Sequence, residues 1–294
     1  MTSSGYLLGL APSHGPQGDH HVDGTAVTLL GWLPLVLLAA AGVGYVALSR
    51  RLRTTQGWPL WRTGAFLLGL ALLGVAFLPA FDAFADRDFA GHAAQHLLLA
   101  MLAPLALVLG TPVTLLLCAL PHAMARQLGS VLGSAPVHLL TRPVVALALS
   151  SGGLVALYFT PLYQLSTEHD AVHLAVHGHL VLSGVLFAWV TVGLDPTPHR
   201  ARVRTRLIVL GISIAVHASV SQLLYAGLLV RVREPVVQMQ AAGSLMYFGG
   251  DIAELLLAAA MLVTARPDPA RRARRGSALP GPGSLPAEAR VRSR

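Results

Sequence analysis

One stretch decides the fold of this chain: Gly91-His92-Ala-Ala-Gln-His96-Leu-Leu-Leu-Ala-Met-Leu-Ala-Pro104. It begins a long apolar run with two histidines four residues apart. In a helix, residues i and i+4 share one face, so His92 and His96 are predicted to point the same way, one turn apart. An apolar helix of this length fits a lipid bilayer, where ionisable side chains are costly and mark functional sites. The pair therefore predicts a site inside a membrane protein.

The composition of the whole chain supports a membrane protein. Of its 294 residues, 54% are hydrophobic and only 12% are charged, whereas about 25% of residues in soluble domains are charged. The net charge of +8 comes from Arg residues between apolar runs and at the C-terminal end, so the expected partner is the lipid bilayer and not nucleic acid. The one cysteine, Cys118, excludes a Cys-x-x-Cys metal site, and its apolar surroundings predict a buried, inert thiol.

Seven apolar runs are long enough to cross a bilayer, because a spanning helix needs about 20 mostly apolar residues. The expected fold is all-α: a polytopic transmembrane helix bundle over residues 25–265, with about seven spans joined by short connections. Residues 1–24, which lack a signal-peptide pattern, are expected to be a flexible extracytoplasmic segment. Residues 266–294 are expected to be a disordered, basic cytoplasmic tail. The predicted spans are 25–49, 60–80, 91–119, 141–160, 171–194, 207–229 and 240–264.

The distribution of arginine predicts the orientation of this bundle. In a seven-span arrangement, all but three of the 21 basic residues fall on one side, and only Arg87, Arg231 and Arg233 fall on the other. Loops rich in arginine stay in the cytoplasm. The N-terminus is therefore predicted to lie outside and the C-terminus in the cytoplasm.

Further histidines and carboxylates lie in the other predicted spans. His173 and His177 form a second i, i+4 pair, at the same membrane side as the first pair, and His217 lies near the middle of the sixth span. Asp251 and Glu254 lie in the seventh span. Imidazole ligates copper, zinc and haem iron, and a carboxylate can orient a ligating imidazole. We expect one cavity, open to the outside, with these metal ligands: His92, His96, His173, His177, His217 and Asp251.

Methionines near these histidines favour copper among the candidate metals. Met101 follows the first pair, Met246 lies in the seventh span, and Met239 lies at the outer end of that span. Thioethers select copper(I), although methionines at such positions are also common core residues. The N-terminal residues His14, Asp19, His20 and His21 are a weaker metal-binding candidate.

Four segments occur in an order and spacing that resemble a known family. They are His92-Ala-Ala-Gln-His96 with Gly110-Thr-Pro112, His173-x-x-x-His177 with Gly193-Leu-Asp195-Pro-Thr-Pro198, His217-Ala218, and Gln240 to Glu254 with its Gly243, Gly250 and Asp251. Over residues 25–265 the chain resembles the multi-pass CtaG family of caa3-type cytochrome c oxidase assembly factors. The resemblance implies a bacterial plasma-membrane protein that is not an enzyme and that assists the maturation of a haem–copper oxidase. Its implied partners are cytochrome c oxidase subunits and a separate copper-import or copper-chaperone protein.

Three functional hypotheses remain open at the level of the residues. The first is an assembly factor that binds copper transiently at the extracytoplasmic histidines. The second is a membrane cytochrome in which His96 and His177 ligate haem b from two helices. The third is a transporter for a small ion or metal that uses His217, Asp251 and Glu254, although the inner halves of the spans offer few polar groups for a path.

Overall fold

The computed structural model describes residues 24–198 and 201–265, and within these ranges the chain forms helices joined by turns. The rest of the expected N-terminal segment, with its histidines, and the expected C-terminal tail from residue 266 lie outside the described residues. The helices are α1 (Gly24–Gln56), α2 (Leu60–Ala76), α3 (Pro79–Ala85), α4 (Phe89–Leu97), the π-helix η1 (Leu98–Leu102), α5 (Ala103–Leu109), α6 (Pro112–Ala119), α7 (His122–Leu132), α8 (Ala135–Leu140), α9 (Pro143–Phe159), α10 (Leu162–Glu168), α11 (Asp170–Val192), α12 (Val203–Ala226) and α13 (Val236–Thr264).

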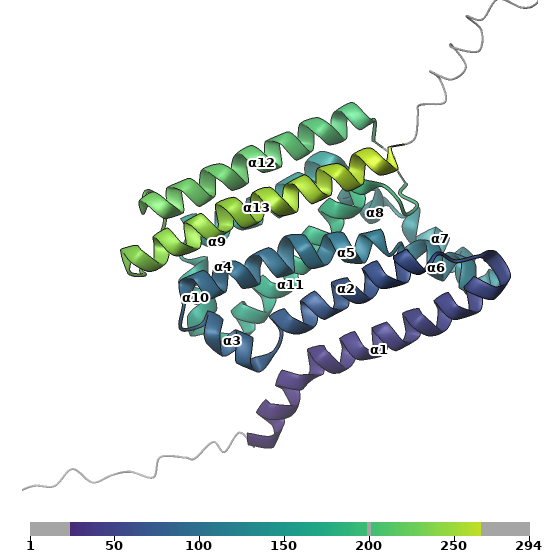
Figure 1. Cartoon of the computed structure of the whole chain (residues 1–294), viewed down its shortest axis with the longest axis horizontal. Helices are drawn as coiled ribbons and strands as arrows, with labels where there is room; N and C mark the ends of the chain where they lie inside the picture. Colours follow the sequence, from purple (N-terminus) through teal and green to yellow (C-terminus); the bar gives the residue numbers. More distant parts are fainter. Residues whose placement is uncertain (1–23, 199–200, 266–294) are drawn as a thin grey trace, which may run out of the picture.

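The long helices lie side by side as a bundle (Figure 1). α12 packs along α13, α13 packs on α4, and α11 packs on α5 and α9, whereas α1 lies at the edge and contacts α2 and α6. One apolar cluster, which includes Phe89, Tyr158 and Met246, fills the end of the bundle near α10. A second, which includes Leu105, Phe187 and Leu257, fills the opposite half.

The predicted set of about seven spans agrees with the helices in part. Five helical segments are long and apolar enough to cross a membrane, and the number rises to seven if each of two bent helix pairs is one span. The axes of α2 and α3 bend by 58°, and those of α9 and α10 bend by 76°. Large apolar side chains such as Leu182 on α11 and Val263 on α13 are exposed on the outside of the bundle. Such a surface suits contact with lipid.

The segment from Phe89 to Ala119 contains the π-helix η1 just before Pro104. In a regular α-helix the ring of Pro104 would clash with the carbonyl group of Ala100, four residues earlier. The wider π turn relieves that clash, and such turns are frequent at functional sites. The carbonyl group of Ala100 lies directly against Gly184 of α11, where a Cβ atom would collide with it. Glycine at this position lets α11 approach η1 closely.

Two features of the far end of the bundle differ from the sequence expectations. Residues 120–140, expected to be a short connection, form the helices α7 and α8, none of whose side chains is buried. Cys118, expected to be buried, is exposed on α6. α6 packs on α1 and α7 at the edge of the bundle, so one of its sides remains open.

Asp195 connects the loop after α11 with the start of α6 at this end of the bundle. Its carboxylate accepts hydrogen bonds from the backbone N–H groups of Val113 (3.3 Å) and Thr114 (2.8 Å), and from the Thr114 hydroxyl. It therefore caps the start of α6 from the loop that follows α11. Burial raises the pKa of Asp195, because desolvation outweighs the opposing effect of these hydrogen bonds.

Candidate metal centre

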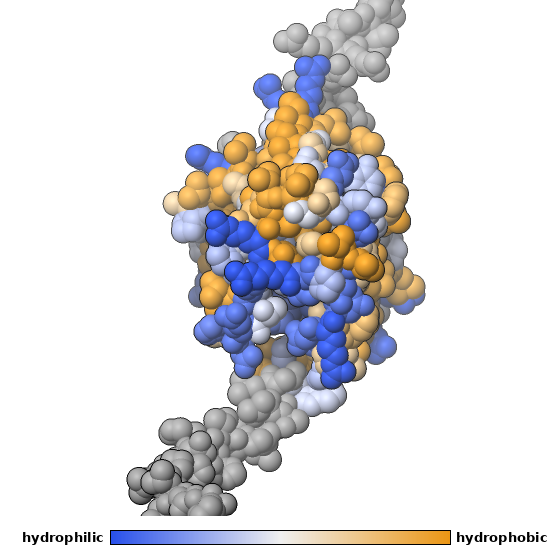
Figure 2. Space-filling view, turned by 90° about the vertical axis from the view of Figure 1, so that its left-hand side faces the viewer, coloured by the Kyte–Doolittle hydropathy of each residue, from blue (hydrophilic) through white to orange (hydrophobic). Residues whose placement is uncertain are grey.

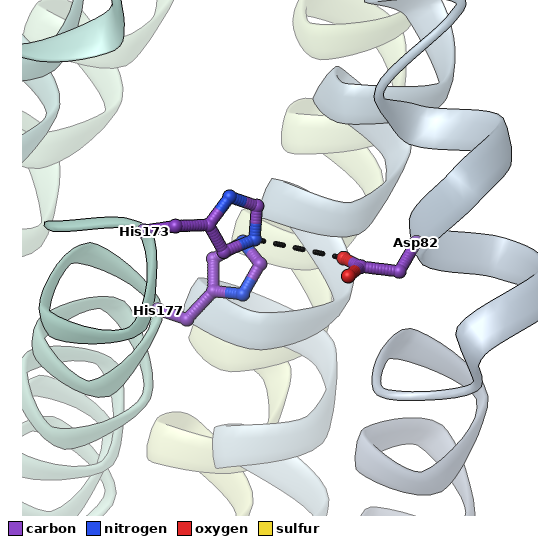
Figure 3. Close-up of side chains that lie close together, drawn as sticks. All are labelled: Asp82, His173 and His177. Atoms are coloured by element: carbon purple, nitrogen blue, oxygen red, sulfur yellow. Dashed lines mark ion pairs between the residues drawn. The ribbon is translucent and has the colours of Figure 1, made fainter. Parts of the chain in front are cut away.

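Asp82 and two histidines converge at the end of the bundle formed by α3 and α10. His173 and His177 lie one turn apart on α11, and their ring centroids are 4.1 Å from each other. Asp82 reaches them from α3, with its Oδ1 atom 3.6 Å from Nε2 of His173 (Figure 3). One ligand atom of each of the three residues lies within 4.8 Å of the others. We call this group the outer triad.

The outer triad depends on the bend between α2 and α3. Pro79 begins α3, where a missing N–H group costs nothing and the fixed φ angle suits the first helical turn. Gln95 of α4 donates from Nε2 to the carbonyl oxygen of Ala76 (2.8 Å) and to Oδ1 of Asp82 (2.9 Å). This fully buried amide ties the end of α2 and the Asp82 carboxylate to α4. It thereby fixes the carboxylate that faces α11.

The outer triad is open to the surface on one side. The Asp82 side chain is 43% exposed and that of His173 is 22% exposed, whereas His177 is buried. Figure 2 looks onto this end of the molecule and shows hydrophilic side chains gathered in the lower middle of an otherwise largely hydrophobic surface. Partial desolvation, followed by the negative charge of Asp82, raises the pKa of the neighbouring Asp86. An ion can therefore reach the triad from one end of the bundle, where negative charge is already concentrated.

His92 and His96 lie behind the outer triad and are not part of it. Both are buried on α4. His92 packs edge-to-face against Tyr163 of α10, at 5.0 Å between centroids, and interacts electrostatically with His173. His96 lies one turn further along and interacts electrostatically with His92, His177 and His217. The first histidine pair thus continues from the second toward the middle of the bundle.

His217 and Asp251, the remaining predicted ligands, lie away from the outer triad. His217 of α12 is buried, and its ring packs directly on the backbone of Gly250 of α13. Asp251 is partly buried and acts electrostatically on His217 and on Glu254. The six predicted ligands, expected in one cavity, are therefore distributed between the triad and a deeper region of the bundle.

Other candidate groups take ordinary structural positions. His179 faces away from the pair on its own helix, as its angular position predicts, and its Nε2 lies 3.1 Å from the carbonyl oxygen of Leu149. Met246 is fully buried in the apolar cluster around Tyr158, and Met239 packs against that cluster. Met101 differs, because it lines a cavity together with His96.

Two residues of the site, Asp82 and Gln95, are not among the predicted ligands. In the seven-span arrangement Asp82 falls on the same membrane side as the histidine pairs, and this is the signal that the sequence offers. Its distance from His173 along the chain hid the contact, because the bend at Pro79 creates it. Gln95 lies inside the His92–His96 motif. Its amide orients the Asp82 carboxylate by a hydrogen bond, whereas the sequence predicted that a carboxylate would orient an imidazole.

The donor set limits the chemistry of the outer triad. Two imidazoles and a carboxylate offer two nitrogen ligands and one oxygen ligand, a set that binds first-row transition metals. In addition, the carboxylate lies against a ring nitrogen of His173 and can fix the orientation of the imidazole. The group can hold an ion, and its exposed side can release it.

The fold and the site define a helical bundle suited to a membrane, with a two-histidine, one-carboxylate group at one end. The chain belongs to the cytochrome c oxidase caa3 assembly factor family (Caa3_CtaG), whose model matches residues 43–267. This finding confirms the resemblance seen in the histidine and glycine motifs.

Similar proteins occur in mycobacteria. An uncharacterized protein of Mycobacterium tuberculosis is 34% identical over 180 residues, which cover 59% of this chain and 27% of that protein. An uncharacterized protein of Mycobacterium leprae is 33% identical over 199 residues, which cover 65% of this chain and 30% of that protein. The chain thus spans less than a third of the length of these relatives. No solved structure matches it.

Proposed function

We propose that this protein holds a copper ion at Asp82, His173 and His177 during assembly of a haem–copper oxidase in the bacterial plasma membrane. The observation that carries the proposal is the convergence of three ligand atoms within 4.8 Å of one another. Membership of the caa3 assembly factor family supports the assembly role. Imidazole is a good ligand for copper, and copper is a metal that a haem–copper oxidase must receive.

The position of the outer triad suits transient binding. We take this end of the bundle to be extracytoplasmic, as the arginine distribution predicts. The ion would arrive from a separate copper-import or copper-chaperone protein and leave toward an oxidase subunit. Partial exposure of Asp82 and His173 leaves one side of the ion accessible to a ligand from either partner. The role is one of binding and transfer, and it requires no catalytic step by this chain.

The experiment is copper(I) binding to the purified full chain in detergent, measured anaerobically by chelator competition. We expect Asp82→Asn and His177→Ala to weaken copper(I) binding at the outer triad at least tenfold. Removal of a residue that only supports a metal ligand already lowers metal affinity by about tenfold or more. His179→Ala is the matched control, because His179 lies on the same helix and faces α9. In membranes of a deletion strain that expresses each variant, oxidase activity should fall for the two triad variants and stay at the wild-type level for His179→Ala. Unchanged copper affinity in both triad variants would contradict the proposal.

The space beside His96 weighs against the haem hypothesis. The cavity between His96 and the neighbouring helices has a volume of about 50 Å³, whereas sites for cofactors and other small molecules usually have about 300 Å³ or more. Haem ligation by His96 and His177 would therefore need the helices to move apart. An absorption spectrum of the purified protein tests this alternative, since bound haem b gives a strong Soret band.

A further inference from the structure

A small polar chamber lies deeper in the bundle than the outer triad. It is lined by residues of α4, η1, α5, α9, α11, α12 and α13 and has a volume of about 50 Å³, enough for one ion or a few water molecules. Apolar side chains line its far end, among them Leu105, Phe187 and Leu257. The residues that give it polar character are His96, Met101, Ser150, Ser151, Ser183, Ser213, His217 and Glu254.

Three of these residues carry buried polar atoms without a hydrogen-bond partner among the described residues. They are Nδ1 of His96, Nε2 of His217 and both carboxylate oxygens of Glu254. Their side chains belong to residues that are 4%, 5% and 2% exposed, respectively. Nearly all buried polar groups in proteins have partners, so each exception needs an explanation. The Glu254 carboxylate most needs such an explanation, because a buried carboxylate inside a membrane is the costliest of these groups to leave unpaired.

Imidazoles connect the chamber with the outer triad. His177 of the triad interacts electrostatically with His92, and His92 with His173. His96, which lines the chamber, interacts electrostatically with His177 and with His92 on one side and with His217 on the other. His92 and His96 lie one turn apart on α4, as His173 and His177 do on α11, and His96 lines the chamber, so imidazoles extend from the outer triad toward the interior of the bundle.

The donors in the chamber fit copper(I) better than a divalent ion. Two imidazoles and the thioether of Met101 form a soft and borderline donor set, which selects copper(I). The Glu254 carboxylate supplies one negative charge, which balances the single positive charge of copper(I). A divalent ion in the same place would leave an excess positive charge in a region of low dielectric, which is expensive.

We propose that this chamber is a second copper(I) site, in which His96, His217 and Met101 bind the ion and Glu254 balances its charge. The inference rests on the proposed function for the choice of copper, and it adds a place where the ion is shielded from water. The ion enters from the outer triad past His92 and leaves by the same route, because the far end of the chamber offers only apolar side chains. Copper stays in the +1 state throughout, so that no electron is exchanged.

The stoichiometry of copper(I) bound to the full chain in detergent tests this inference. Chelator competition under anaerobic conditions should give two ions per chain in the wild type. We expect one ion in Asp82→Asn, which retains the chamber, and one in Glu254→Gln or His217→Ala, which retain the outer triad. Size-exclusion chromatography and helical circular dichroism identify variants that fail to fold.

X-ray absorption at the copper edge gives a second, independent readout. The chamber predicts a copper–sulfur distance in the fully loaded wild type that disappears in Met101→Leu. Met246→Leu is the matched control, since this methionine is buried in the apolar cluster around Tyr158. A sulfur signal that persists in Met101→Leu, or is absent from the wild type, would overturn the inference.

The outcomes separate this inference from the proposed function. One ion per chain, lost in Asp82→Asn and retained in Glu254→Gln, His217→Ala and Met101→Leu, would overturn the chamber and leave the outer triad in place. One ion lost only in the chamber variants would support the chamber and contradict the triad. A wild type that binds no copper(I) would overturn both, and the chamber would then be a site for water only.

Discussion

At the scale of single residues, Gln95 lies between His92 and His96 and holds the Asp82 carboxylate of the outer triad in place. Its amide is fully buried and makes the one hydrogen bond that fixes the Asp82 carboxylate against α4. It also binds the carbonyl oxygen of Ala76, at the point where α2 ends. A single side chain therefore links the end of α2, next to the bend at Pro79, with the carboxylate of the outer triad.

We expect Gln95→Leu to weaken copper(I) binding at the outer triad by about 10-fold to 100-fold, the range found when a residue that orients a metal ligand is removed. Leucine keeps the approximate volume of glutamine but cannot donate to Asp82. Gln238→Leu is the matched control, because Gln238 accepts a hydrogen bond from the Phe89 N–H group and makes none with Asp82 in the described part of the chain. Competition with a copper(I) chelator measures both variants. If Gln95→Leu kept full affinity, Asp82 would not need this support.

At the scale of elements, the π-helix η1 packs closely against α11 near the two sites. The carbonyl group of Ala100 meets Gly184, and Pro104 also lies near the space that a Cβ atom at Gly184 would occupy. His96 precedes η1 and Met101 belongs to it, so that this turn sets where both side chains enter the chamber. The close contact is thus a condition for the chamber as well as for packing.

Replacement of Gly184 by alanine tests this contact. The new methyl group would meet backbone atoms, which cannot rotate away, so we expect a loss of about 1–3 kcal/mol in stability, as for other overpacked cores. Gly178→Ala is the control on the same helix, because a Cβ atom there meets open space. Alanine should leave stability unchanged at that position or raise it by up to about 1 kcal/mol. Thermal unfolding in detergent measures both, and equal melting temperatures would show that η1 adapts to α11.

At the scale of the whole molecule, the apolar runs predicted most of the bundle. Each of the seven predicted runs overlaps a long helix or a bent helix pair, because the need to satisfy backbone hydrogen bonds in lipid leaves helices as the available structure. The helices α7 and α8 were missed, since none of their residues is buried and no long apolar run marks them.

The candidate site was less predictable than the bundle. The spacing of His92 and His96, and of His173 and His177, correctly indicated two pairs that each share a helix face, because this follows from helix geometry alone. The contact between Asp82 and His173 depends on a 58° bend, and the division between triad and chamber depends on how seven helical segments pack. Tertiary packing of this kind leaves little trace in local sequence patterns.

The distribution of arginine predicts an orientation of the bundle that a labelling experiment can test directly. Positive residues concentrate at the end formed by the loops after α1, α6 and α11, opposite the outer triad. We expect a cysteine at Glu168, in a Cys118→Ser background, to react with a membrane-impermeant maleimide in intact cells. A cysteine at Gln127 should react only after the cells are opened, because α7 lies at the arginine-rich end. Both positions are exposed, so differences in burial do not explain a difference in labelling. The reverse pattern would place the triad in the cytoplasm, and copper would then have to reach it from the cytoplasmic pool.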